Sequence, residues 1–234
     1  MARGLCQSRS RARDAILRGT VLVNGQPARK PSQGVFDVDV LSVHDIAQNY
    51  VSRAAVKLLH GLDHFKISVE GRCALDIGAS TGGFTQVLLE RRAAHVTAVE
   101  VGHSQMVHEL SSDPRVTLHE GLNARDLSRE HVDENVSLIV CDVSFIPLKL
   151  ALTPALELVK SRAELVALLK PQFEVGREHV GRGGMVTDTI QHVRVCDEVS
   201  AFLAAQDWSV HGIISSPVDG GDGNAEFLVG AVKR

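Results

Sequence analysis

Hydrophobic and polar residues alternate along this chain in short runs that glycine-rich turns separate. Apolar runs with the composition of buried strands occupy residues 73–77, 95–100, 116–118, 136–141, 163–169, 208–214 and 225–232. Segments with the period of an amphipathic helix begin at Phe84 and Leu148 and after the cap residues Thr187 or Asp188. Strands that alternate with helices predict an α/β domain with a mostly parallel, seven-stranded sheet. A glycine-rich turn over residues 220–224 would let the last strand run antiparallel.

The turn after the first of these strands carries the strongest chemical signal. It has the sequence Asp76-Ile77-Gly78-Ala79-Ser80-Thr81-Gly82-Gly83-Phe84, and it joins a strand to a helix as adenosine-binding turns do. Its glycines are not spaced as in the dinucleotide fingerprint G-x-G-x-x-G. The next strand ends on Glu100, whose carboxylate can accept hydrogen bonds from both ribose hydroxyls. This pattern favours S-adenosylmethionine, with NAD as the competing cofactor and a plain strand–helix connection as the structural alternative.

Nine residues make up this predicted cofactor site. Gly82 and Gly83 would let the backbone approach the amino-acid part of the cofactor, and Phe84 would flank it. Asn123 is placed to meet the adenine edge. The full set is Asp76, Gly78, Ser80, Gly82, Gly83, Phe84, Glu100, Asn123 and Asp142.

A basic segment precedes the sheet. Residues 1–34 carry seven Lys and Arg against a single acid, a charge of +6, whereas the other 200 residues carry 18 basic and 27 acidic groups, a charge of −9. A basic head on an acidic body indicates contact with a polyanion, and a solvated helix face is the alternative. The pattern of this head predicts a helix over residues 8–19 capped by Ser8 or Ser10, a strand over 21–23, an Asn24-Gly25 turn and a strand over 36–43.

The head resembles the S-four-like RNA-binding fold, named after a small-subunit ribosomal protein, in residues 8–12, 18–25 and 30–32. In that fold a helix face and the adjoining hairpin bind structured RNA. We therefore expect RNA contacts from Arg9, Arg11, Arg13, Arg18, Lys30 and Arg53. Proteins of this type usually have a further helix, opening Arg-Leu-Asp, ahead of the position of Met1. We therefore expect either an N-terminally abbreviated head or a true start that lies upstream.

Opposite charges follow two neighbouring strands of the predicted sheet. Asp142 ends the fourth strand and Lys170 the fifth, at the edge where open parallel sheets bind their ligands. Glu226 stands at the start of the last strand, so it shares that edge only if this strand is antiparallel. The helix pattern over residues 50–60, with Ser52 as a possible cap, places Lys57 beside the apolar stripe and predicts a surface lysine.

Most of the chain resembles the TlyA family, historically labelled haemolysins, within the FtsJ-like ribose methyltransferases. The matching runs are residues 50–53, 57–58, 75–85, 142–146, 170–177 and 223–227. The resemblance implies a Rossmann-like methyltransferase domain, which we place at residues 52–234, after a head at 1–45 and a linker at 46–51. It also implies methyl transfer from S-adenosylmethionine to a ribose 2′-hydroxyl of ribosomal RNA, at a cytidine, by a catalytic set of Lys57, Asp142, Lys170 and Glu226.

The chemistry of this reaction explains why such residue types are needed. A ribose hydroxyl is a weak nucleophile, and an amine can activate it when burial and a second cation favour the neutral form of the amine. Our hypothesis is that Lys170 deprotonates or orients the hydroxyl and that Asp142 positions Lys170. Lys57 would tune the charge and hold the nucleotide, and Glu226 would orient the lysines. Alignment of hydroxyl, methyl and sulfur would supply much of the rate.

Other functional classes fit the sequence less well. A base N-methyltransferase would have prolines after the acid, where this chain has Asp142-Val143-Ser144-Phe145. A cytosine C5 methyltransferase would need a cysteine nucleophile, and Cys141 belongs to a buried strand and is predicted to be a core residue. A non-catalytic RNA-binding protein with a methyltransferase fold leaves the four charged positions unexplained. The family's old label suggests a membrane-lytic protein, but the sequence pattern indicates no basic amphipathic helix and no export signal that would support this class. Four scattered cysteines without a CxxC pair predict no metal site and a cytoplasmic protein, and no feature indicates an oligomeric state.

Overall fold

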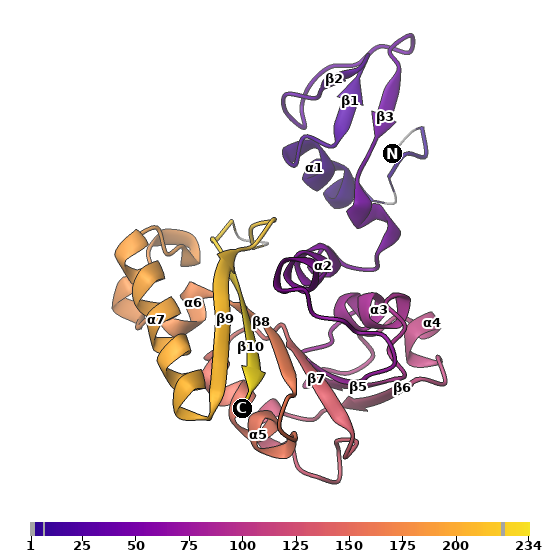
Figure 1. The fold of residues 1–234 in the computed structure, drawn as a ribbon. Coiled ribbons are helices and arrows are strands. Elements are labelled where there is room, and N and C mark those ends of the chain that lie inside the picture. The colour runs from indigo at the N-terminus through magenta and orange to yellow at the C-terminus, as the bar shows by residue number, and fades with distance from the viewer. Residues whose placement is uncertain (1–2, 7, 221–222) are drawn as a thin grey trace. The chain divides into compact units, whose positions relative to one another are not determined.

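The structure, a computed structural model, describes residues 3–6, 8–220 and 223–234 (Figure 1). The chain divides into two compact units, Met1–Tyr50 and Val51–Arg234. We call them the head and the catalytic unit, and we describe each by itself.

The head is one helix beside a small antiparallel sheet. Helix α1 (Arg9–Leu17) begins at Ser8, whose side chain accepts a hydrogen bond from the Arg11 amide. The strands are β1 (Val21–Val23), β2 (Gln26–Pro27) and β3 (Leu41–Val43), in the order β2-β1-β3. Asn24 and Gly25 have φ of 52° and 78°, as a two-residue hairpin turn of type I′ requires. The predicted helix, first strand and turn are therefore confirmed.

The second strand of the head is shorter than the alternating sequence predicted. Of the predicted strand 36–43, only Leu41–Val43 forms ladder pairs with β1, and the residues before it form a turn in which the Asp39 amide donates to the Phe36 carbonyl. The Asp39 side chain in turn accepts from the Phe36 amide. Alternation alone does not make a strand when no partner strand lies alongside, and Phe36 is 77% exposed. A short 3₁₀ helix, η1 (Ile46–Asn49), ends the head.

Seven strands form the sheet of the catalytic unit. Their spatial order is β6-β5-β4-β7-β8-β10-β9. The strands are β4 (Cys73–Ile77), β5 (His95–Glu100), β6 (Val116–Glu120), β7 (Val136–Cys141), β8 (Glu164–Leu169), β9 (Trp208–Ser215) and β10 (Phe227–Lys233). The predicted α/β sheet is confirmed, and all seven of these strands agree with their predicted bounds to within two residues.

The last strand reverses direction, and this decides where Glu226 lies. Strand β10 pairs antiparallel with both β8 and β9, with Phe227 opposite Leu169. The start of β10 therefore meets the end of β8, at the same edge as the ends of β4 and β7. The turn predicted over residues 220–224 includes 221 and 222, which lie outside the described residues.

Helices cover both faces of the sheet (Figure 1). Helices α2 (Ala54–Phe65) and α3 (Gly83–Glu90) lie on one face, and α5 (Leu148–Leu158) and α7 (Thr189–Ala205) on the other. The main hydrophobic core lies under α5 and α7, whose leucines and valines pack against inward side chains such as Leu75, Ile139 and Leu165. Shorter elements complete the unit: α4 (His108–Ser111), η2 (Ala124–Asp126), α6 (Pro171–Glu174), η3 (Arg177–His179) and η4 (Arg182–Gly184). No described helix is long and apolar enough to cross a membrane.

Helix α2 departs from the sequence prediction in two ways. It begins at Ala54 rather than near Tyr50, and Arg53 takes the position before its first residue, while the Ser52 hydroxyl accepts from the Ala54 amide. Lys57, predicted at the surface, is only 7% exposed. The prediction was wrong because β10 brings a carboxylate against this helix, which a one-element pattern cannot show.

A close contact between α2 and β10 tests this packing. A methyl group at Gly230 would lie 2.5 Å from the Phe65 ring, whereas one at Gly212, paired with Gly230 on the neighbouring strand, would lie 3.9 Å from the same ring. We expect Gly230→Ala to lower the free energy of unfolding by about 1–3 kcal/mol, because overpacking displaces Phe65. Gly212→Ala, the matched control, should change it by less than about 0.5 kcal/mol. Urea denaturation measures both, and equal stabilities of the two variants would contradict this packing.

Candidate functional site

Three adjoining cavities open at the carboxyl edge of the sheet. The large cavity, of about 680 Å³, is lined by the β4 turn, by Glu100 and Asn123 and by residues 142–147. The lysine cavity, of about 440 Å³, is lined by Lys57, Ser144, Phe145, Lys170, Gln172, Phe173, Val180, Gly184 and Glu226. The small cavity, of about 150 Å³, lies over residues 78–84 and also contains Ser52, Asp142 and Lys170 in its wall. The volume of the large cavity is typical of a small-molecule site.

Glycines shape the turn after β4. Gly82 has a φ of 98°, a conformation that disfavours side chains, and it begins α3. A methyl group at Gly78 would overlap the carbonyl oxygen of Asp142, and the Asp142 amide donates to the Ile77 carbonyl at 2.9 Å. The ends of β4 and β7 are thereby held in contact. A methyl group at Gly83 would lie 2.8 Å from Ser52, so the turn is also closed on the α2 side.

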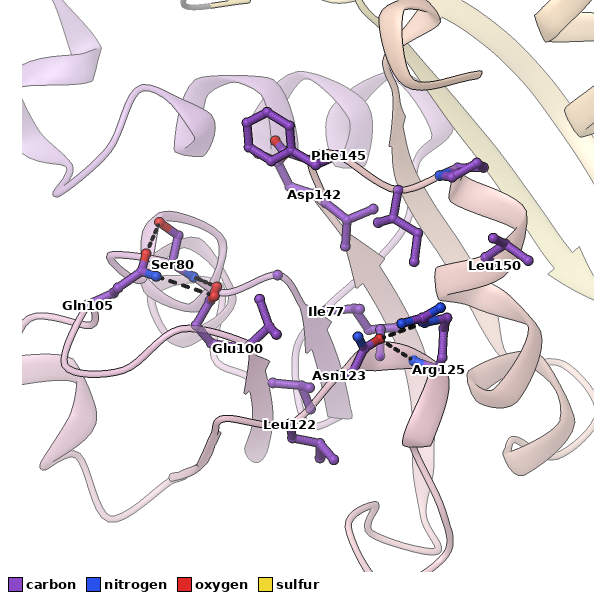
Figure 2. Close-up of a pocket in the computed structure, with 18 residues that line it drawn as sticks. Ile77, Ser80, Glu100, Gln105, Leu122, Asn123, Arg125, Asp142, Phe145 and Leu150 are labelled. Carbon is purple, nitrogen blue, oxygen red and sulfur yellow. Dashed lines mark hydrogen bonds between the residues drawn. The ribbon is translucent and has the colours of Figure 1, made fainter. Parts of the chain in front are cut away.

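Glu100 lies at the mouth of the large cavity with its carboxylate fixed by neighbours. One oxygen accepts from the Ser80 amide at 2.9 Å and the other from the Gly102 amide at 2.7 Å. Gln105 donates to this second oxygen at 3.4 Å and accepts from the Ser80 hydroxyl (Figure 2). A carboxylate has lone pairs left for a ligand after these bonds. Its position fits the predicted contact with ribose hydroxyls.

Asn123 and Arg125 line another part of the large cavity (Figure 2). The Asn123 side-chain oxygen accepts from the Arg125 backbone amide and from its guanidinium, at 3.1 and 3.2 Å. This oxygen caps η2, so the local turn fixes the side chain at the cavity wall. The adenine contact predicted for Asn123 stays a prediction.

Asp76 is a buried carboxylate with an unsatisfied oxygen. It is fully buried, its Oδ2 accepts from the Thr85 hydroxyl at 2.7 Å, and its Oδ1 has no hydrogen-bond partner among the described residues. Burial raises the pKa of Asp76 from 3.8 to about 7, against the Thr85 hydrogen bond that lowers it. A buried orphan acceptor beneath a glycine-rich turn fits a ligand that brings a positive charge or an N–H donor.

A lysine and two oxygens meet where the cavities join. The Lys170 amine lies 2.5 Å from Asp142 Oδ1 and donates to the Ser144 hydroxyl at 3.0 Å. Lys170 follows β8 and Asp142 follows β7, and these strands pair in parallel. The two strand-end charges, Asp142 and Lys170, therefore lie side by side, as the sequence predicted.

A second ion pair lies beside the first. Lys57 of α2 donates to Glu226, and both are buried, with exposed fractions of 7% and 5%. Burial raises the pKa of Glu226 above its ordinary value, although the charges of Lys57 and Lys170 act in the opposite direction. Removing one partner of such a buried pair would leave an uncompensated charge, so its members depend on each other.

Two aromatic rings lie at the opening of the lysine cavity. Phe145 is 90% exposed and has a φ of 67°, a conformation that is rare and strained for a bulky residue. Its ring lies near that of Phe173, with centroids 5.1 Å apart and the planes tilted by 50°. An exposed aromatic held in a strained conformation beside a cavity offers a flat face to a planar ligand.

Asn224 fixes the glycine-rich loop that forms another wall of the lysine cavity. Its side chain is 1% exposed, accepts from the Val186 amide and donates to the Gly184 carbonyl, each at 2.9 Å. Asn224 lies two residues before Glu226, so one turn positions both the loop and the carboxylate. The loop carries Arg177 and Arg182, which are exposed.

The structure brings together all the charged residues predicted for catalysis: Lys57, Asp142, Lys170 and Glu226. The residues predicted to bind the cofactor line the large cavity, the small cavity or both, except Asp76 and Gly82, which line neither. Sequence reasoning assigned no role to Ser144, Phe145, Thr85, Gln105 and Asn224. The sequence feature that could have pointed to these residues is their proximity to predicted site residues, because all but Gln105 lie within three positions of one.

Five of the predicted RNA-binding residues lie in the head, where they fall into two groups. Arg11 donates to the Tyr50 carbonyl at 2.7 Å and Arg18 pairs with Asp45, so both hold the head together. Arg9, Arg13 and Lys30 are exposed. Arg53 belongs to the catalytic unit, directly before α2. Contact with RNA stays a prediction for all of them.

Comparisons with known proteins agree with this geometry. The sequence matches the FtsJ-like methyltransferase family over residues 50–233 and the S4 domain over residues 1–35. It is 45% identical to the 16S/23S rRNA (cytidine-2′-O)-methyltransferase TlyA of Mycobacterium tuberculosis, over 97% of this chain and 85% of that protein. The structure of a protein described as a hemolysin from Streptococcus thermophilus superposes with a TM-score of 0.79 at 39% identity, over 99% of this chain and 85% of that one. An S-adenosylmethionine-dependent methyltransferase from Listeria monocytogenes, 13% identical, shares the fold with a TM-score of 0.59, over 78% and 100% of the two chains.

The raised pKa of Asp76 predicts how stability depends on pH. The folded-state pKa lies above the unfolded value, so this group's contribution is fully present below about pH 4 and is lost as pH rises through about 7. The loss amounts to at most about 4 kcal/mol, since one pKa unit corresponds to about 1.4 kcal/mol. Asp76→Asn keeps the shape and stays neutral, so its free energy of unfolding should fall less between pH 5 and pH 8 than that of the wild type.

Urea denaturation across this pH range measures the effect. Glu157→Gln, which neutralises an exposed carboxylate, is the matched control and should follow the wild type. Parallel curves for Asp76→Asn and the wild type would contradict the assignment.

Proposed function

This chain belongs to the TlyA family of FtsJ-like methyltransferases, and from that membership we propose that it methylates a ribose 2′-hydroxyl of ribosomal RNA, at a cytidine. The acceptor follows from the name of the M. tuberculosis relative, together with the S4 match of the head. The observation that carries the proposal is the convergence of two lysine–carboxylate pairs: Lys57–Glu226 lines the lysine cavity, and Asp142–Lys170 lies where that cavity meets the other two. Ribosomal subunits are the expected partner, so we place the protein in the cytoplasm.

The methyl donor of the family is S-adenosylmethionine, and the residues present fit it. The orphan Oδ1 of buried Asp76 and the glycines at 78, 82 and 83 suit its charged amino-acid part. Glu100 is placed for the ribose and Asn123 for the adenine edge. When bound, this cofactor supplies a methyl group on a sulfonium centre as the electrophile.

The residues around the lysine cavity would then prepare the acceptor. Lys170 contacts the 2′-hydroxyl, orients its oxygen and, as the neutral amine, receives the proton released when the oxygen–methyl bond forms. Asp142 holds that amine at the border of the large and lysine cavities. Lys57, paired with Glu226, supplies a second positive charge that favours the developing negative charge on the oxygen.

Phe145 would hold the nucleotide that carries this hydroxyl. Enzymes that act on a nucleotide within folded RNA take it out of the stack, and aromatic side chains then stack on the exposed base. The exposed ring of Phe145, beside Phe173, has the position for that contact.

Two competing functions give different results in one assay. Purified protein would be incubated with methyl-labelled S-adenosylmethionine and separated ribosomal subunits, and the labelled nucleotide mapped. A 2′-O-methylated cytidine in ribosomal RNA is the expected product. A non-catalytic RNA-binding protein would bind subunits without labelling them, and label on a base would indicate a base methyltransferase. Cys141 is fully buried in the core and burial raises its pKa, so a cysteine nucleophile has no support here.

Lys170→Ala tests the assignment of the amine. It should lower kcat by about 10²- to 10⁴-fold, the usual contribution of a general base, while calorimetry shows cofactor affinity within about threefold of the wild type. Lys160→Ala, which removes an exposed lysine ahead of β8, is the control and should retain full activity. Wild-type turnover by Lys170→Ala would remove Lys170 from the mechanism.

The exposed basic residues of the head predict a salt effect. Arg9→Ala and Arg13→Ala should each weaken subunit binding and reduce the slope of log affinity against log salt concentration by about 1, because each removes one phosphate contact. Arg92→Ala, at the opposite edge of the sheet from the cavities, should leave the slope unchanged. Filter binding over a salt series measures the slopes, and identical slopes for all variants would exclude this surface.

A further inference from the structure

Ser144 lies where the three cavities meet. Among the described residues it is the one that lines the large, the lysine and the small cavity together. Asp142 borders two of them and Lys170 two. The Ser144 hydroxyl therefore faces the route from the cofactor cavity to the cavity proposed for the acceptor.

The hydroxyl also restricts the amine that the proposed mechanism uses. The Lys170 amine donates to Ser144 at 3.0 Å and lies 2.5 Å from Asp142 Oδ1. A lysine amine ends a flexible chain and carries up to three N–H groups. Two fixed partners leave one direction for a third contact. Without the serine, Asp142 would hold the amine at one point only, and the amine could swing about it.

The backbone that carries Ser144 is fixed at both ends. On one side the Asp142 amide donates to the Ile77 carbonyl at 2.9 Å. On the other side the Glu174 carboxylate accepts from the Leu148 amide at 2.7 Å, which ties the start of α5 to α6, the helix directly after Lys170. The backbone segments that carry Ser144 and Lys170 are therefore tied to each other, and the serine hydroxyl has a fixed position from which it can orient the amine.

We propose that Ser144 is a positioning residue for methyl transfer, which aims the Lys170 amine at the acceptor hydroxyl. The inference rests on the proposed function and deepens it, because it assigns the geometry of the amine to a side chain outside the four charged residues. Ser144 carries no charge and stays unchanged by the reaction. It acts through the direction of one hydrogen bond, so we expect its removal to change kcat rather than the affinity for either ligand.

Three variants test the proposal. Ser144→Ala removes the oxygen and should lower kcat about 10- to 100-fold, the range expected when a hydrogen bond to an amine that becomes charged as it takes up the proton is lost. KM for the ribosomal subunit and the dissociation constant of S-adenosylmethionine should stay within about twofold. Ser144→Thr keeps the oxygen and should restore most of the rate. Thr153→Ala, which removes an exposed hydroxyl on α5 that lines none of the three cavities, is the matched control and should behave as the wild type.

The outcomes distinguish failure of the role proposed for Ser144 from failure of the proposed methyltransferase function. A variant that only damaged folding would lower the melting temperature and the active fraction, and Ser144→Thr would rescue neither. Ser144 is exposed, so we expect unchanged melting temperatures. Wild-type kcat in Ser144→Ala, or a loss confined to KM, would overturn the positioning role and leave the proposed function intact. A wild-type protein that labels no ribosomal RNA would instead overturn the proposed function, and the role of Ser144 with it.

Discussion

The pairing of two lysines with two carboxylates, of which Lys57, Lys170 and Glu226 are buried and Asp142 is half-buried, is the constraint around which the catalytic unit is arranged. Burying a single charge is costly, so each of these side chains needs its partner in place. Lys57 comes from α2, Asp142 from the end of β7, Lys170 from the end of β8 and Glu226 from the start of β10. Helix α2 must therefore lie against the sheet, and β10 must run antiparallel. Replacing such pairs by apolar residues usually costs little stability, which indicates that their value here is chemical.

The sheet supplies the second constraint, which is closeness at its carboxyl edge. Gly78 allows the end of β4 to touch the backbone of Asp142, and this contact places the glycine-rich turn beside the Asp142–Lys170 pair. The orphan oxygen of Asp76 and the carboxylate of Glu100 lie on one side of that contact, and the two ion pairs lie on the other. A reaction between two ligands needs their reacting atoms within about 3.5 Å. Cavities that share walls meet this need without any large motion of the chain.

Division of labour between the two units follows from their charges. The head carries most of its basic residues on or near α1, and some of them, such as Arg11 and Arg18, hold the head itself together. Arg9 and Arg13 are left facing solvent. The catalytic unit carries a net negative charge, and its lysines at the site are neutralised by partners. The net positive charge therefore lies in the head, and the paired lysines and carboxylates lie at the edge of the sheet.

Sequence patterns alone were enough to predict the strands of the catalytic unit, the glycine-rich turn and the two strand-end charges Asp142 and Lys170. Each of these is written in a local pattern, because a buried strand, a tight turn and the residue that ends a strand all lie within a few positions. The burial of Lys57 and the place of Ser144 at the meeting point of three cavities follow from the packing of segments that are distant in the chain. The periodicity of a helix predicts which side chains share a face, but a neighbouring segment determines whether the side chains on that face are exposed. Glu226, 169 residues away in the chain, is that cover for Lys57.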